Sequence, residues 1–158
     1  RLTRKPTQSF AAARRMGRQL ALQGLYQWHL TGYSAETIWQ QFQEEAEAEQ
    51  SGAEYFRELL TGVIDSVKML DSTLSQYTSR RMALVDPVEA SVLRLAAFEL
   101  MQRPEVPYRV VINEALDLEH AFGAADAHKF VNGVLDRLAK QFRGDEITAQ
   151  QTPDSSAE

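Results

Sequence analysis

Apolar side chains recur every three or four residues along most of this chain, which is the spacing of one face of an α-helix. No segment shows the alternation of apolar and polar positions that is typical of a half-buried strand. The longest regular stretch has apolar side chains at Phe56, Leu59, Val63, Val67, Leu70 and Leu74. The pattern therefore predicts an all-α protein of about seven helices joined by short loops.

Residue types at the ends of the apolar stretches predict helix boundaries in the N-terminal half. The first helix is expected to begin near Phe10 and to stop at Gly32, and Ser34 is expected to cap the second helix. An acidic run then leads into residues 51–52, Ser-Gly, which predict an exposed loop before a third helix begins near Glu54.

The C-terminal half opens on Asp86-Pro87, a capping residue followed by the residue type favoured in a first helical turn. Residues 88–101 are apolar almost all round, which predicts a central buried helix. Gly123 is expected to end the next helix, and Asp126 is expected to cap the last one.

The helical pattern leaves two polar ends. Residues 1–9 hold basic and polar side chains with almost nothing to bury, which predicts a disordered basic arm. Residues 144–158 hold four acids and no basic or aromatic residue, which predicts a disordered acidic tail. Between these ends, Pro87 is expected to separate two small helical subdomains, about 10–84 and 85–143.

Composition narrows the class of protein. The chain has no cysteine, which excludes disulfides and thiolate metal sites, and its apolar runs fall far short of the ~20 residues of a membrane span. We therefore expect a cytoplasmic protein. Its three histidines do not form a metal-binding pattern, and no phosphate-binding glycine loop or nucleophile motif is present. We expect no catalytic residue, no metal and no cofactor.

Basic charge is concentrated at the start of a chain whose net charge is −5. The first 35 residues hold six basic residues and no acid, so the other 123 carry −5 − 6 = −11. Arg14 and Arg18 share a helix face, Arg15 widens the patch, and guanidinium groups pair well with phosphates. The pattern favours a nucleic acid over the two alternatives, a solvated helix face and a membrane surface.

Several blocks of sequence resemble the NusB family of transcription antitermination factors. The most specific blocks are residues 106–115 (VPYRVVINEA) and 128–136 (HKFVNGVLD), with Phe122-Gly123 between them. Further blocks in family order are residues 21–28 (ALQGLYQW), 55–63 (YFRELLTGV) and 93–100 (LRLAAFEL). The resemblance covers roughly residues 14–142 and implies a non-enzymatic protein of two small helical subdomains.

The family resemblance also implies partners and a binding path. It implies binding of the single-stranded boxA element of nascent ribosomal-operon RNA together with NusE, a small-subunit ribosomal protein. This pair joins an antitermination complex on RNA polymerase with other Nus factors. The RNA contacts implied for this chain are Arg14, Arg15, Arg18, Tyr77, Asp126, Lys129 and Phe130.

Some of these assignments have structural alternatives. Phe130 heads a core stripe and Asp126 suits a helix cap, although a helix N-terminus can bind phosphate and an aromatic ring can stack on an unpaired base. Glu89, expected to be exposed at the start of the central helix, is the expected contact for the protein partner. Its alternative role is ordinary compensation of the helix dipole.

Two other classes of protein stay open. One is a helical module related to the N-terminal domains of ribosomal-RNA cytosine methyltransferases, although the chain has no strand-rich or glycine-rich cofactor region. The other is a protein scaffold whose basic arm contacts acidic protein surfaces.

Overall fold

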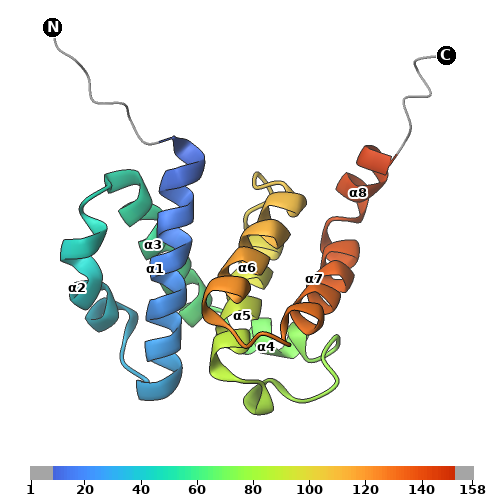
Figure 1. Ribbon diagram of the computed structural model, residues 1–158, viewed down its shortest axis with the longest axis horizontal. Helices are drawn as coiled ribbons and strands as arrows, with labels where there is room; N and C mark the ends of the chain where they lie inside the picture. Colours follow the sequence, from blue (N-terminus) through green and yellow to red (C-terminus); the bar gives the residue numbers. More distant parts are fainter. Residues whose placement is uncertain (1–8, 152–158) are drawn as a thin grey trace, which may run out of the picture. The chain divides into compact units, whose positions relative to one another are not determined.

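A computed structural model describes residues 9–151 of the 158-residue chain (Figure 1). These residues form eight α-helices and one short 3-10 helix, with no strand in the described part of the chain. The all-α prediction is confirmed. The chain divides between Ser66 and Val67 into two units, which are described in turn. The predicted basic arm, apart from Ser9, lies outside the described residues.

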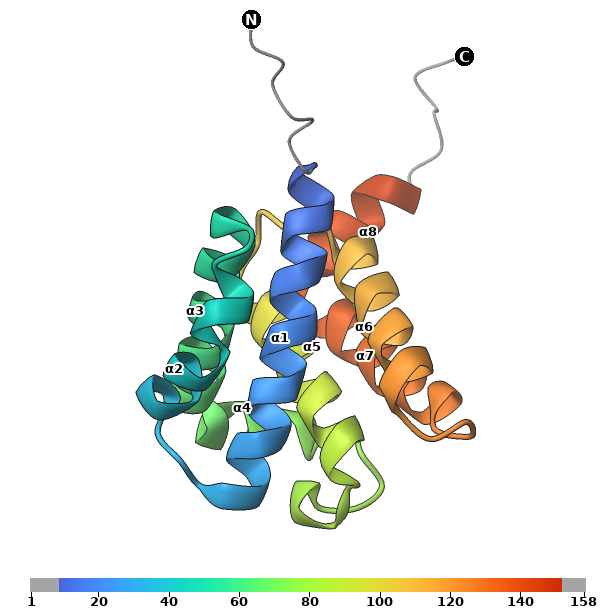
Figure 2. The same ribbon diagram turned by 60° about the vertical axis from the view of Figure 1, so that its left-hand side comes forward.

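Three helices form the first unit: α1 (Phe10–Thr31), α2 (Ala35–Ala46) and α3 (Gln50–Asp65). Helix α1 packs along α3, and α2 contacts both of them (Figure 2). The predicted boundaries at Gly32 and Ser34 are confirmed. Gly32 has a left-handed backbone conformation with φ 71°, and the Ser34 side chain accepts a hydrogen bond from the Thr37 N–H.

Glycine lets α1 and α3 approach closely. A Cβ atom placed on Gly17 would lie 2.9 Å from the Gly52 carbonyl oxygen, which is shorter than a van der Waals contact. A Cβ atom on Gly52 would lie 2.8 Å from the Ala13 carbonyl oxygen. The prediction of a loop at residues 51–52 is wrong. Both residues lie in the first turn of α3, because Gly52 packs against α1 there.

Gly17→Ala should lower the free energy of unfolding by about 1 to 3 kcal/mol, because the added methyl group meets backbone atoms that cannot move aside cheaply. Gly133→Ala is the matched control, since a Cβ atom on this helical glycine meets nothing within 4 Å. It should raise stability by about 0.5 to 1 kcal/mol through helix propensity. Urea denaturation of both variants measures the difference, and equal effects would argue against the close approach.

The second unit is built around a buried helix. Its elements are α4 (Val67–Leu74), a 3-10 turn (Met82–Leu84), α5 (Pro87–Gln102), α6 (Tyr108–Phe122), α7 (His128–Phe142) and α8 (Gly144–Gln151). Helix α5 contacts α4, α6 and α7, as expected for the predicted central helix. Asp86 caps it by accepting a hydrogen bond from the Val88 N–H, which confirms the predicted start.

The boundary between the units lies earlier in the chain than the predicted one at residues 84–85. The apolar stripe continues across Ser66, but the helix breaks there, and α4 packs against α5. Arg94 of α5, which is 6 % exposed, pairs with Asp71 of α4 through two hydrogen bonds of 2.8 and 2.9 Å. This pair ties α4 to the C-terminal unit.

Two predictions about the C-terminal unit are wrong. Asp126 does not cap α7: the capping position is Ala127, which makes no side-chain bond, and Asp126 is exposed. The predicted disordered tail is helical over Gly144–Gln151, and residues 152–158 lie outside the described part. The end of α6 at Gly123 is confirmed.

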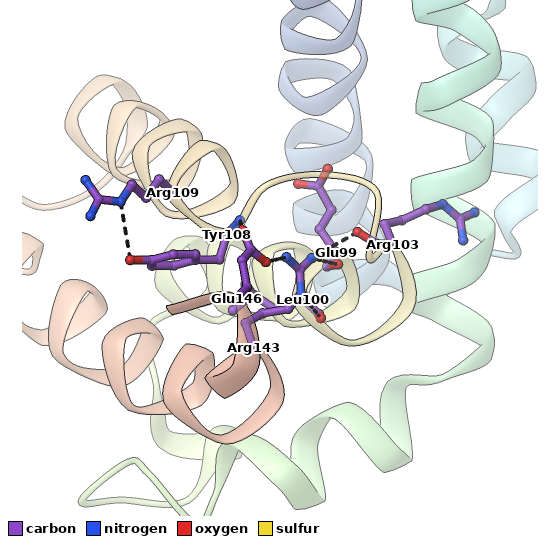
Figure 3. Close-up of polar contacts among 7 residues, drawn as sticks. All are labelled: Glu99, Leu100, Arg103, Tyr108, Arg109, Arg143 and Glu146. Carbon is purple, nitrogen blue, oxygen red and sulfur yellow. Dashed lines mark hydrogen bonds and ion pairs between the residues drawn. The ribbon is translucent and has the colours of Figure 1, made fainter. Parts of the chain in front are cut away.

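Buried Arg143 explains why α8 is held in place. Its guanidinium donates to the carbonyl oxygens of Leu100, Glu99 and Arg103 at the end of α5, at 2.9, 3.2 and 2.9 Å (Figure 3). It also pairs at 2.6 Å with Glu146 of α8. The other Glu146 oxygen accepts a hydrogen bond from the Tyr108 N–H at the start of α6. The two members of this ion pair thus hydrogen-bond the backbone groups at the end of α5 and at the start of α6.

Candidate nucleic-acid interface

Arg14 is held at the surface of the first unit by aromatic rings. Its guanidinium carbon lies 4.0 Å from the ring centroid of Tyr55 and 4.6 Å from that of Phe10. Stacking uses the flat face of the guanidinium and leaves its in-plane N–H groups suited to a bidentate acceptor such as phosphate. Arg15, on the same turn, is exposed. Both positions suit the predicted contact with an anion.

Arg18 differs from its two neighbours. Only 3 % of its surface is exposed, and its guanidinium carbon lies 5.5 Å from the Tyr55 ring centroid. A side chain buried to this extent packs inside the fold, so the expectation that three arginines form one exposed patch is corrected to Arg14 and Arg15. The i, i+4 spacing that groups Arg14 with Arg18 does not tell which turn of the helix is covered.

Phe10 is a candidate contact that the sequence reasoning missed. It is 71 % exposed at the first turn of α1, beside Arg14. An exposed aromatic next to a basic side chain is suited to stacking on an unpaired base. The signal available in the sequence was an aromatic residue at the start of a helix with no apolar partner before it.

A second basic and aromatic cluster lies in the C-terminal unit. Arg137 of α7 donates to the Tyr77 carbonyl oxygen at 2.6 Å, and the Arg80 guanidinium carbon lies 5.5 Å from the Phe130 ring centroid. The segment after α4 therefore lies against α7, which brings two predicted residues, Tyr77 and Phe130, onto the same part of the unit. Arg80 was missed, although the adjacent arginines at 80 and 81 were a visible signal.

The N-terminal end of α7 borders this cluster. Lys129 and Asp126 are exposed, whereas Phe130 and Tyr77 are half-buried. Among the described residues, no side chain caps α7, so its first N–H groups suit an anion. The arrangement joins a cation, an aromatic face and a helix N-terminus, which together suit a single-stranded nucleic acid.

Glu89 is not exposed, contrary to the prediction. It is 3 % exposed and lies beside Glu119 of α6, which is 1 % exposed. Burial first, and then the neighbouring Glu89 and Asp86 carboxyl groups, raise the pKa of Glu119 to about 8. The Glu89 carboxylate accepts a hydrogen bond of 3.3 Å from the Ala124 N–H. This position indicates a structural role, because the carboxylate is turned into the unit.

An exposed apolar stripe on the first unit was also missed as a possible partner surface. Tyr26 and Leu30 of α1 are 40 % and 59 % exposed, and Tyr33, just after the helix, is 46 % exposed. Tyr26 and Leu30 are four residues apart and so lie on one helix face. Neighbouring exposed apolar side chains mark protein contact surfaces more often than isolated ones do.

Other kinds of site find no support in the part of the chain that the structure describes. Residues 9–151 contain no group of three or more His, Asp or Glu side chains that could hold a metal ion. None of the helices within this range is long and apolar enough to cross a membrane. The fold and its surfaces define an all-α protein of two helical units, each with a basic and aromatic surface.

Comparisons with known proteins identify the family. The NusB family model matches residues 15–140. Transcription antitermination protein NusB of Hahella chejuensis is 48 % identical over 139 residues, covering 88 % of this chain and 93 % of that protein. The protein of the same name from Alcanivorax borkumensis is 47 % identical over 146 residues, covering 92 % and 97 %.

Solved structures agree with these sequence relationships. T. maritima NusB has a TM-score of 0.73 and 31 % identity, covering 81 % of this chain and 91 % of that chain. A structure of the antitermination factors NusB and NusE in complex with double-stranded RNA has a TM-score of 0.75 and 26 % identity, covering 82 % and 98 %. The chain belongs to the NusB family. The expectation of a non-enzymatic protein agrees with these names.

Proposed function

We propose that this chain is an RNA-binding transcription antitermination factor. It binds the boxA element of nascent ribosomal-operon RNA together with NusE, and it acts in the cytoplasm on RNA polymerase with other Nus factors. The observation that carries this proposal is the similarity, over most of both chains, to proteins named Transcription antitermination protein NusB. The solved complex of NusB, NusE and RNA supports both partners.

In this proposal RNA contacts both basic surfaces. Arg14 and Arg15 bind phosphates, with the Tyr55 ring holding the Arg14 guanidinium in position. In the C-terminal unit, Lys129 contacts phosphate and the Phe130 and Tyr77 rings stack on bases. Exposed Asp126 accepts hydrogen bonds from base amino groups. Buried Arg18 supports Tyr55 and does not contact RNA.

NusE is proposed to dock on the exposed apolar stripe of Tyr26, Leu30 and Tyr33. Protein interfaces are enriched in tyrosine and have apolar centres, which matches this set of side chains. Buried Glu89 is not part of this contact.

Charge reversal at Arg14 and Arg15 tests the RNA surface. If the wild type contacts about four to six phosphates, the logarithm of its affinity for boxA RNA should fall with the logarithm of salt at a slope of about −3 to −4. The double variant Arg14→Glu with Arg15→Glu should reduce that slope by about 1.4 and lower the affinity by about tenfold or more. Fluorescence anisotropy over a salt series measures both quantities.

Arg57→Glu is the matched control for Arg14→Glu. Like Arg14, Arg57 is an arginine of the first unit stacked on an aromatic ring, 4.7 Å from the Trp39 centroid, but it is exposed and pairs with Glu36. Its reversal should leave the salt slope unchanged. Binding that is insensitive to salt, or unchanged in the double variant, would refute the RNA surface. The scaffold alternative is tested by adding NusE and boxA RNA separately and together. If the chain is only a protein scaffold, its affinity for NusE should not rise when boxA RNA is added.

A further inference from the structure

Two carboxyl groups lie together at a buried position in the C-terminal unit. Glu89 comes from the first turn of α5 and Glu119 from the last turn of α6, and they are 3 % and 1 % exposed. Both Glu119 oxygens are buried and have no hydrogen-bond partner within the described residues. If both groups were ionised, two negative charges would lie together with no donor for Glu119. A proton on Glu119 supplies a donor that Glu89 can accept.

The carboxyl pair touches the loop between α6 and α7. A Cβ atom on Gly123 would overlap the Glu119 carboxyl group and lie 2.6 Å from Glu89 Oε2, so any larger residue here would displace these carboxyl groups. The next residue, Ala124, donates its N–H to Glu89 Oε2 at 3.3 Å. The first two residues of the loop therefore rest on the pair.

This loop is short and carries part of the proposed RNA surface. Only four residues, 124–127, separate Gly123 from the start of α7, and the Ala127 N–H closes a turn on the Ala124 carbonyl oxygen at 3.1 Å. Asp126 lies in this turn and Lys129 in the first turn of α7. A shift at Gly123 or Ala124 therefore changes where these side chains lie.

We propose that Glu89 and Glu119 are positioning residues for RNA binding: one proton, shared by the two carboxyl groups, holds the α6–α7 loop so that Asp126 and Lys129 face RNA. This inference rests on the proposed function. Loss of the proton leaves two adjacent carboxylates, whose repulsion pushes Gly123 and Ala124 away from α5. RNA affinity then falls as the pair ionises.

The neighbouring charges do not relieve this repulsion. Asp86, at the start of α5, adds a further negative charge that favours the protonated form of Glu119. His120, next to Glu119 on α6, and His128, at the start of α7, are exposed. Measurements between pH 7 and pH 9 span the raised pKa of Glu119, which is about 8.

The test compares the pH dependence of boxA RNA affinity at constant ionic strength. For the wild type, affinity should fall by about fivefold or more between pH 7 and pH 9, a coupling of ordinary size between two sites. Glu119→Gln has a permanent N–H donor and no charge, so it should keep the wild-type affinity of pH 7 across the range. Asp117→Asn removes an exposed acid from the same helix and should retain the wild-type pH profile.

A second measurement follows the loop without RNA. Alanine methyl groups labelled with ¹³C at Ala124 and Ala125 should change chemical shift with an apparent pKa near 8 in the wild type and not in Glu119→Gln. If neither the wild type nor the variants bind RNA but the methyl shifts titrate, the proposed function fails. The effect of the carboxyl pair on the loop is then still supported. Methyl shifts that do not titrate, or titrate while RNA affinity stays level, would overturn the positioning role.

Discussion

Arg143→Met is expected to lower the free energy of unfolding by about 3 to 5 kcal/mol, the range for breaking a buried, hydrogen-bonded ion pair. The substitution keeps most of the aliphatic volume but removes the donors to three carbonyl oxygens at the end of α5. It also leaves Glu146 without its cation. Urea denaturation followed by circular dichroism measures the loss.

Arg137→Met is the matched control for this prediction. Arg137 also donates to a distant carbonyl oxygen, that of Tyr77, but it is exposed. Its removal should cost about 1 kcal/mol or less, because water replaces the lost donor. Glu146→Gln should be intermediate, since the amide oxygen still accepts from the Tyr108 N–H while the ion pair is lost. Equal losses at Arg143 and Arg137 would show that burial of the Arg143 network is unimportant.

Glu119→Gln is expected to raise the free energy of unfolding at pH 8 by about 2 to 4 kcal/mol. In the folded protein the pKa of Glu119 is raised from 4.5 to about 8, mainly by burial. Between these values the native state holds a proton that the unfolded state has released. Stability therefore falls as pH rises from about 5 to 8, by at most about 1.4 kcal/mol per pH unit, and levels off above.

Glutamine removes this proton dependence because it has no ionisable group. Thermal unfolding at several pH values should show that wild type and Glu119→Gln converge near pH 4.5 and diverge up to pH 8. Asp117→Asn, at an exposed position on the same helix, should follow the wild-type slope. A Glu119→Gln slope equal to that of the wild type would refute a proton held at Glu119.

The basic surfaces show how far side-chain chemistry can be predicted before a fold is known. The acid-free start of the chain predicts a basic surface on α1, where Arg14 is half-buried and stacked on the Tyr55 ring and Arg15 is exposed. Arg18 was grouped with them by spacing, but a helix covered on one side buries some members of any such group. Glu89 was misplaced for a related reason: a helix start is exposed only where no other element covers it.

Local signals determined most helix ends. Ser34 and Asp86 cap their helices through their own side chains, and Gly32 adopts the left-handed conformation that ends α1. These features act within a few residues, so the sequence is sufficient to predict them. The same kind of signal failed at residues 51–52, because their backbone is used for packing against α1.

The sequence by itself determined the all-α class, the central buried helix, the basic start of the chain and the blocks that resemble the NusB family. Helical periodicity, caps and charge counts act over short distances along the chain. Only the tertiary structure decided that residues 144–151 form a helix tied to α5 and α6 by Arg143 and Glu146. Only the tertiary structure places the Glu89 and Glu119 carboxyl groups together beside Gly123. Such contacts join residues far apart in sequence, and their energies depend on burial, which no local pattern specifies.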